Sequence, residues 1–86
     1  MSVTTHQFIL LTTLGCHLCN QAKAVLWQAQ SVVAFEYSEQ DIALSDGLIA
    51  TYGERIPVVR SELSGAELDW PFTVKAIEQL VKTLNK

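Results

Sequence analysis

The chain has 86 residues and a net charge of -3. Hydrophobic residues make up 49% of it and charged residues 17%, which is ordinary for a globular protein and unlike a disordered one. This length suits a single domain over 1–86 with one modest core. Because nucleic-acid binders normally carry a basic face and membrane spans need about 18 apolar residues, we expect neither partner.

The chain has two cysteines, Cys16 and Cys19. A bridge between them would close a loop too small to remove much entropy from the unfolded state, so a purely structural disulfide is not expected. The N-terminal sequence has no basic segment and no small-residue cleavage site, unlike a signal peptide. In a chain without a secretory signal this spacing indicates redox or metal chemistry, and we expect a cytoplasmic protein.

The first half of the chain alternates between strand and helix signals. The apolar run 7–12 is typical of a strand buried on both faces, and the helical spacing that follows predicts a helix from 16 or 17 to 30. Residues 33–39 place aromatics two apart with polar residues between them, which predicts a half-buried strand near a sheet edge. A Ser-Asp start and a glycine stop predict a short helix over 45–52.

The second half continues the alternation. Residues 56–60 predict another apolar strand, with proline near its start where a missing N–H is tolerated. A Ser-Gly turn leads into a returning hairpin strand at 66–68, and an apolar stripe predicts a closing helix over 72–84. The order β-α-β-α-β-β-α predicts an α/β fold. Its four-stranded mixed sheet has two parallel strands, an antiparallel hairpin and helices on both faces.

The segment Cys16-His17-Leu18-Cys19 lies where the first strand has ended and the first helix begins. A helix N-terminus carries about half a positive charge and free N–H groups, which lower the pKa of a thiol placed there. Residues three apart on a helix are neighbours, so the two sulfurs can form and break a disulfide with little backbone movement. We therefore expect Cys16 to attack a substrate disulfide and Cys19, one turn further in, to resolve the mixed disulfide.

Two neighbours are candidates for tuning the thiolate. Gly15 removes a side chain directly before the nucleophile, which eases the approach of a partner. His17 lies between the cysteines and, when protonated near the sulfur, would stabilise the thiolate.

With these residues identified, the chain resembles the thioredoxin superfamily, and most closely glutaredoxins and a glutaredoxin-like family of uncertain function. The resemblance covers nearly the whole chain and rests on Cys16-His17-Leu18-Cys19 and on Ile56-Pro57-Val58. It implies a thioredoxin fold, a cis Pro57 that faces the active site, and a redox-active disulfide used in cell redox homeostasis. It also implies that Leu18, Ile56 and Pro57 contact the substrate, with Ile56 offering backbone groups to an extended chain.

The resemblance also sets the expected partners. They are a disulfide-containing protein or a glutathione mixed disulfide, handled by a monomer without a bound cofactor, with glutathione as a candidate co-substrate. Arg55, beside the proline, would attract a carboxylate of glutathione or of an acidic peptide, although it also fits a surface cation before a strand. Glutaredoxins usually have proline and tyrosine between the cysteines, where this chain has His17 and Leu18.

Two other functions stay open. A thioredoxin-fold binding module would hold a partner at the Pro57 edge without redox turnover. A metal or iron–sulfur carrier would use Cys16 and Cys19, but a structural zinc needs four ligands. A second chain or a bound thiol would have to complete such a site, so no metal site is predicted.

Overall fold

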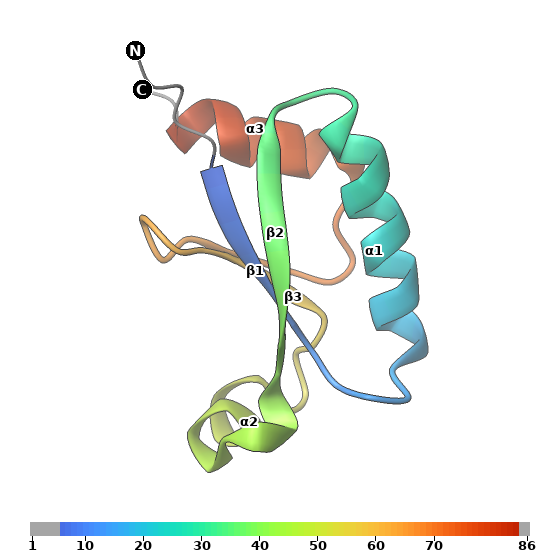
Figure 1. The fold of residues 1–86 in the computed structure, drawn as a ribbon, viewed down its shortest axis with the longest axis vertical. Helices are drawn as coiled ribbons and strands as arrows, with labels where there is room; N and C mark the ends of the chain where they lie inside the picture. The colour runs from blue at the N-terminus through green and yellow to red at the C-terminus, as the bar shows by residue number, and fades with distance from the viewer. Residues whose placement is uncertain (1–5, 85–86) are drawn as a thin grey trace.

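A computed structural model describes residues 6–84, and its elements follow the predicted order (Figure 1). A 3₁₀ turn, η1, was not expected from the sequence. It follows the second strand, where the Asp41 side chain accepts a hydrogen bond from the Ala43 N–H at 2.9 Å. The elements are β1 (His6–Thr12), α1 (His17–Gln30), β2 (Phe35–Asp41), η1 (Ile42–Leu44), α2 (Asp46–Tyr52), β3 (Val58–Ser61), β4 (Glu67–Asp69) and α3 (Val74–Leu84).

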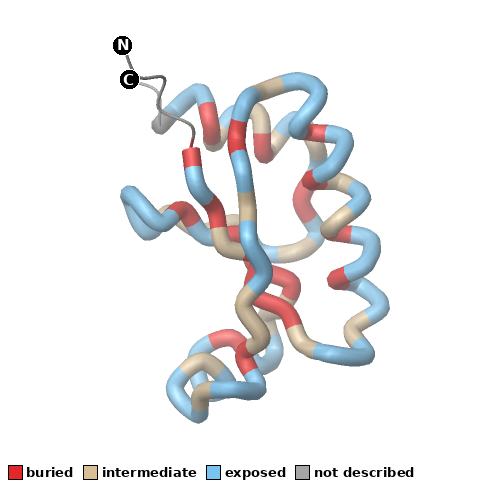
Figure 2. Tube along the Cα trace, in the orientation of Figure 1, coloured by how far each residue is buried: buried red, intermediate tan, exposed pale blue. Residues whose placement is uncertain are grey.

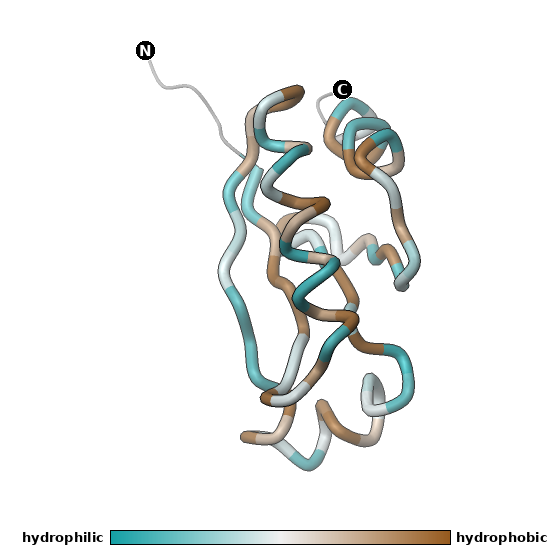
Figure 3. The backbone as a smooth tube through the Cα atoms, turned by 90° about the vertical axis from the view of Figure 1, so that its right-hand side faces the viewer, coloured by the Kyte–Doolittle hydropathy of each residue, from teal (hydrophilic) through white to brown (hydrophobic). Residues whose placement is uncertain are grey.

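The strands form a four-stranded mixed sheet in the order β2-β1-β3-β4. Strand β1 pairs with β2 in parallel and with β3 antiparallel, and β3 forms the antiparallel hairpin with β4. The predicted edge position of β2 is confirmed, and Figure 3 shows that strand as largely hydrophilic. Thr12 pairs with Asp41 and Leu11 with Val58, so the end of β2 and the start of β3 flank the end of β1.

Helices cover both faces of the sheet, as predicted. Phe8 and Leu10 of β1 belong to the larger core beneath α1 and α3, whereas Leu11 joins a smaller cluster with Tyr52 of α2. This division follows from the alternation of side chains along a strand. Figure 2 shows the buried positions of β1 and β3 at the centre of the molecule, where both clusters meet the sheet.

Two strands begin two residues later than the sequence pattern indicates. Val33 was expected in the second strand, but its N–H donates to the Ala29 carbonyl at 3.0 Å, so the chain is still turning there. Ile56 was expected in the third strand, but its N–H donates to the Tyr52 carbonyl at 3.1 Å and β3 starts at Val58. In both places the preceding helix extends its hydrogen bonding into the connection. The other boundaries agree within two residues.

The Ile56–Pro57 peptide bond is cis, as the resemblance implies, and so is Trp70–Pro71. Within residues 6–84 no helix is both long and apolar enough to cross a membrane.

Candidate active site

The connection from β1 brings the two cysteines to the start of α1. Gly15 has φ +79°, a left-handed conformation that glycine adopts without steric cost. A Cβ placed there would meet no atom within 4 Å, so the requirement is conformational rather than spatial. Cys16 then adopts an extended conformation (φ -85°, ψ 106°) as the N-cap of α1.

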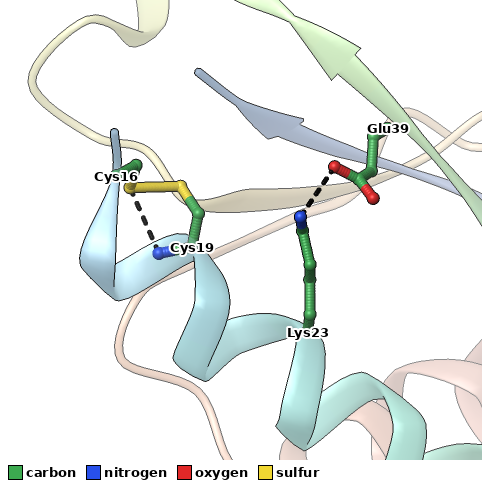
Figure 4. Close-up of a disulfide and its surroundings, with 4 residues drawn as sticks. All are labelled: Cys16, Cys19, Lys23 and Glu39. Carbon is green, nitrogen blue, oxygen red and sulfur yellow. Dashed lines mark hydrogen bonds and ion pairs between the residues drawn. A yellow bond between two sulfur atoms is a disulfide. The ribbon is translucent and has the colours of Figure 1, made fainter. Parts of the chain in front are cut away.

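The Cys16 sulfur accepts a hydrogen bond from the Cys19 N–H at 3.1 Å (Figure 4). It takes the place that a serine or aspartate oxygen usually occupies at a helix N-cap. An N–H donor in this position would stabilise a negative charge on the sulfur more than a neutral thiol. The predicted position of Cys16 at the start of the helix is confirmed.

Cys16 and Cys19 form a disulfide, with their Cα atoms 5.2 Å apart (Figure 4). The two residues differ in accessibility, because Cys16 is partly exposed and Cys19 is only 2% exposed. Cys16 is therefore the more accessible of the two residues. Around them His17 is exposed, and Leu18 and Leu14 expose apolar surface, at 45% and 91% of each residue.

A pocket of about 320 Å³ opens beside the disulfide, on the β2 side of β1. Across it Lys23 of α1 and Glu39 of β2 form an ion pair, with Nζ and Oε1 3.0 Å apart (Figure 4). The pocket is lined by Thr12, Thr13, Leu14, Gly15, Cys16, His17, Cys19, Asn20, Lys23, Glu39 and Asp41.

Sequence reasoning missed the charged residues of this pocket. Lys23 follows Cys19 by four residues, a spacing that places both on one face of α1 and could have identified it. Glu39 and Asp41 fit a solvated strand face in the sequence, and only the parallel pairing of β1 with β2 brings them beside the disulfide.

The predicted docking residues Ile56 and Pro57 lie on the other side of β1, at the start of β3. Neither of them lines the pocket. Pro57 is fully buried, and its carbonyl accepts a hydrogen bond from the Trp70 N–H at 3.1 Å. Ile56 is half-buried, and its N–H is already donated to Tyr52, which leaves its carbonyl as the backbone group to offer to an extended substrate.

Arg55 is held by two carboxylates of β4. Its Nε and Nη2 donate to the two oxygens of Asp69 at 3.1 and 2.7 Å, and Nη2 also donates to Glu67 Oε1 at 2.6 Å. The guanidinium lies 5.0 Å from the centre of the Tyr52 ring, and the Tyr52 hydroxyl donates to Glu67 Oε2 at 2.5 Å. We call these four residues the Arg55 clamp: Tyr52, Arg55, Glu67 and Asp69.

A sequence profile of the glutaredoxin-like domain family (DUF836) matches residues 7–82. The chain belongs to the glutaredoxin-like domain family. It is 36% identical to target protein XcR50 from X. campestris, whose X-ray structure has a TM-score of 0.75, with 88% of this chain and 96% of that chain covered. It is 25% identical to protein Ne2328 from Nitrosomonas europaea, whose solution NMR structure has a TM-score of 0.80, with 93% and 95% covered. No curated protein sequence matches the chain.

In this glutaredoxin-like domain, the members of the Arg55 clamp shift one another's pKa values. The hydrogen bonds from Arg55 lower the pKa of Asp69. Hydrogen bonds from the Tyr52 hydroxyl and then from Arg55 lower the pKa of Glu67. The hydrogen bond to Glu67, together with burial, raises the pKa of Tyr52. At neutral pH the clamp therefore holds a cationic guanidinium, two carboxylates and a neutral phenol.

The clamp was not expected from the sequence of the glutaredoxin-like domain. Arg55, expected either to attract a substrate carboxylate or to be a surface cation before a strand, is paired with Glu67 and Asp69. The available signal was the spacing of Glu67 and Asp69, which are two apart and therefore share one face of a strand. Within residues 6–84 no three His, Cys, Asp or Glu side chains converge as metal ligands.

Proposed function

We propose that this protein is a thiol–disulfide oxidoreductase with a dithiol mechanism. The Cys16 thiolate attacks one sulfur of a substrate disulfide, and the departing substrate thiolate takes a proton from solvent. The thiol of Cys19 then loses its proton and attacks the Cys16 sulfur, which releases the second substrate thiolate. The substrate has gained two electrons, and the protein holds the Cys16–Cys19 disulfide. An external thiol reductant, with glutathione as the candidate co-substrate, reduces it again.

The hydrogen bond from the Cys19 N–H to the Cys16 sulfur is the observation that carries this proposal. It favours the thiolate at the sulfur that a partner can reach, while Cys19 stays protected until the mixed disulfide has formed. We assign His17 and Gly15 to tuning and access at this thiolate. Membership of a glutaredoxin-like family supports the same chemistry.

Substrate docking is assigned to the exposed surface of Leu18 and to the edge formed by Ile56 and Pro57. The Ile56 carbonyl would accept a hydrogen bond from the backbone of an extended substrate, in the manner of strand addition. The substrates are disulfide-containing proteins or glutathione mixed disulfides, and the mechanism needs no bound cofactor. We place the activity in the cytoplasm, in a monomer.

A redox titration in glutathione buffers, quenched and read by intact mass, tests the proposal. We expect a reversible two-proton mass change with a midpoint between about -270 and -120 mV, the range of working oxidoreductases. The Cys19→Ser variant should stop at a mixed disulfide on Cys16, and the matched Cys16→Ser variant should form none. If Cys16 and Cys19 form no disulfide anywhere in this range of potentials, the result would contradict the redox function and favour a binding module.

A further inference from the structure

The Arg55 clamp occupies the position at which the sequence points to a receptor for substrate carboxylates. We propose instead that Arg55 is a positioning residue, which holds the Ile56–Pro57 edge in place for the substrate and does not itself bind it. This inference rests on the proposed oxidoreductase function and concerns how the same site recognises its substrate.

The first support is the place of the side chain between the proline edge and the neighbouring strand. Arg55 directly precedes Ile56, and its guanidinium donates to Asp69 and Glu67 of β4. Directly after Asp69, the Trp70 N–H donates to the Pro57 carbonyl at 3.1 Å. The side-chain hydrogen bonds of Arg55 hold the chain before Ile56 to the end of β4, and the backbone hydrogen bond holds Pro57 to the residue that follows β4. The Ile56–Pro57 edge is therefore tied to β4 at both of its ends.

Tyr52 supplies the second support, from the buried side. Its carbonyl accepts hydrogen bonds from the N–H groups of both Arg55 and Ile56, at 2.8 and 3.1 Å. Its ring packs against the Arg55 guanidinium, and its hydroxyl donates to Glu67. Because Tyr52 is only 5% exposed and belongs to the smaller core cluster, the clamp is anchored in the interior of the protein.

The third support is that the guanidinium has no free pair of parallel donors for a further carboxylate, because both of its two-donor edges include Nη2. A bidentate grip on a carboxylate uses two parallel N–H donors, and Nη2 already donates to both Asp69 and Glu67. A substrate carboxylate could form a bidentate pair with Arg55 only by displacing one of these bonds, and without that it is limited to single hydrogen bonds from Nη1. It would also approach two like charges whose oxygens lie 2.6 and 2.7 Å from Nη2.

The test uses two tripeptide disulfides, uncharged Ac-Ala-Cys-Ala-NH₂ and anionic Ac-Asp-Cys-Asp-NH₂, with pre-reduced protein in single turnover. Arg55→Met and Asp69→Asn both break the clamp. Both should raise the half-saturating concentration of either peptide about three- to tenfold, because the edge must be ordered on binding. The maximal rate and the potential of the Cys16–Cys19 couple should stay unchanged. Arg55→Lys, which keeps the charge and loses the fork of donors, should show a smaller rise.

Lys82→Met is the matched control, because it removes the partly exposed Lys82–Glu78 ion pair of α3 and should change neither peptide's reaction. A receptor role predicts opposite effects, with Arg55→Met weakening only the anionic peptide and Asp69→Asn, which removes one of the two carboxylates that hold the guanidinium, strengthening it. That pattern, or no change in either variant, would overturn the proposal. If Arg55→Met does not fold, Asp69→Asn decides between the two roles by the sign of its effect. Wild-type protein that reacts with neither peptide would instead contradict the oxidoreductase function, and the positioning role with it.

Discussion

The two sides of β1 both carry ion pairs but hold them differently. On the β2 side, the Lys23–Glu39 ion pair lies beside an open pocket, and its side chains are 38% and 47% exposed. On the β3 side, the Arg55 clamp makes three hydrogen bonds to β4 and is anchored on the buried Tyr52. A partner that docks on both sides of β1, as proposed above, would meet one fixed edge and one adaptable surface. Fixed edges suit backbone recognition, and open pockets suit varied side chains.

The largest expected effect is at the anchor of the fixed side. Tyr52→Ala should lower the free energy of unfolding by about 3–5 kcal/mol, because it leaves a cavity in the smaller core cluster. Tyr52→Phe, which removes only the hydroxyl that Glu67 accepts, should cost about 1 kcal/mol. Urea unfolding followed by circular dichroism measures both.

Tyr37→Ala on β2 is the matched control, because Tyr37 is half-buried on the strand of the open side. It should cost clearly less than Tyr52→Ala, in proportion to the smaller area that it removes from the core. Equal losses for the two alanine variants would show that the β3 side is no better anchored than the β2 side.

The next effect is an acid sensitivity that belongs to the fixed side. Because the folded-state pKa values of Glu67 and Asp69 lie below their ordinary values of 4.5 and 3.8, their contribution to stability is complete above those values. It is lost as the pH falls through the lowered values, where both carboxylates take up protons. The stability difference between wild type and Arg55→Met should therefore be constant above about pH 5 and shrink as the pH falls below 4.

Urea unfolding of both proteins from pH 7 to pH 2.5 measures this difference. Lys82→Met provides the comparison, since its partly exposed ion pair lies on α3, outside the clamp. If the difference in free energy of unfolding between wild type and Arg55→Met does not change with pH, the pKa values of the two β4 carboxylates do not depend on the guanidinium.

The parts of the molecule that follow local rules were predictable from the sequence. Strand and helix periods gave the element order, and the two-residue aromatic spacing in 33–39 gave an edge strand. The position of Cys16 at a helix start followed from the change of period after Gly15. Each of these features depends on residues that are close together in the chain.

The parts that depend on distant pairing were not predictable in the same way. The partners of Arg55 are 12 and 14 residues away, and only the register of β3 against β4 decides which side chains of the hairpin face it. Lys23 and Glu39 likewise meet through the packing of α1 beside β2. Without that register, a basic residue before a proline could be either a ligand receptor or a structural cation.

The smallest expected effect is on the open side. Lys23→Met should change the free energy of unfolding by less than about 0.5 kcal/mol, because an exposed ion pair gains little and is screened by salt. Asp69→Asn in the clamp should cost more, since the amide keeps one acceptor oxygen for Arg55 but places an NH₂ donor against its second N–H donor. Unfolding at low and high salt separates the two: the Lys23–Glu39 contribution should disappear in 1 M salt, whereas the bidentate Arg55–Asp69 contribution should fall without disappearing. If Lys23→Met lowers the free energy of unfolding as much as Asp69→Asn does, the pocket is held as rigidly as the proline edge. Both sides would then be fixed before a substrate arrives.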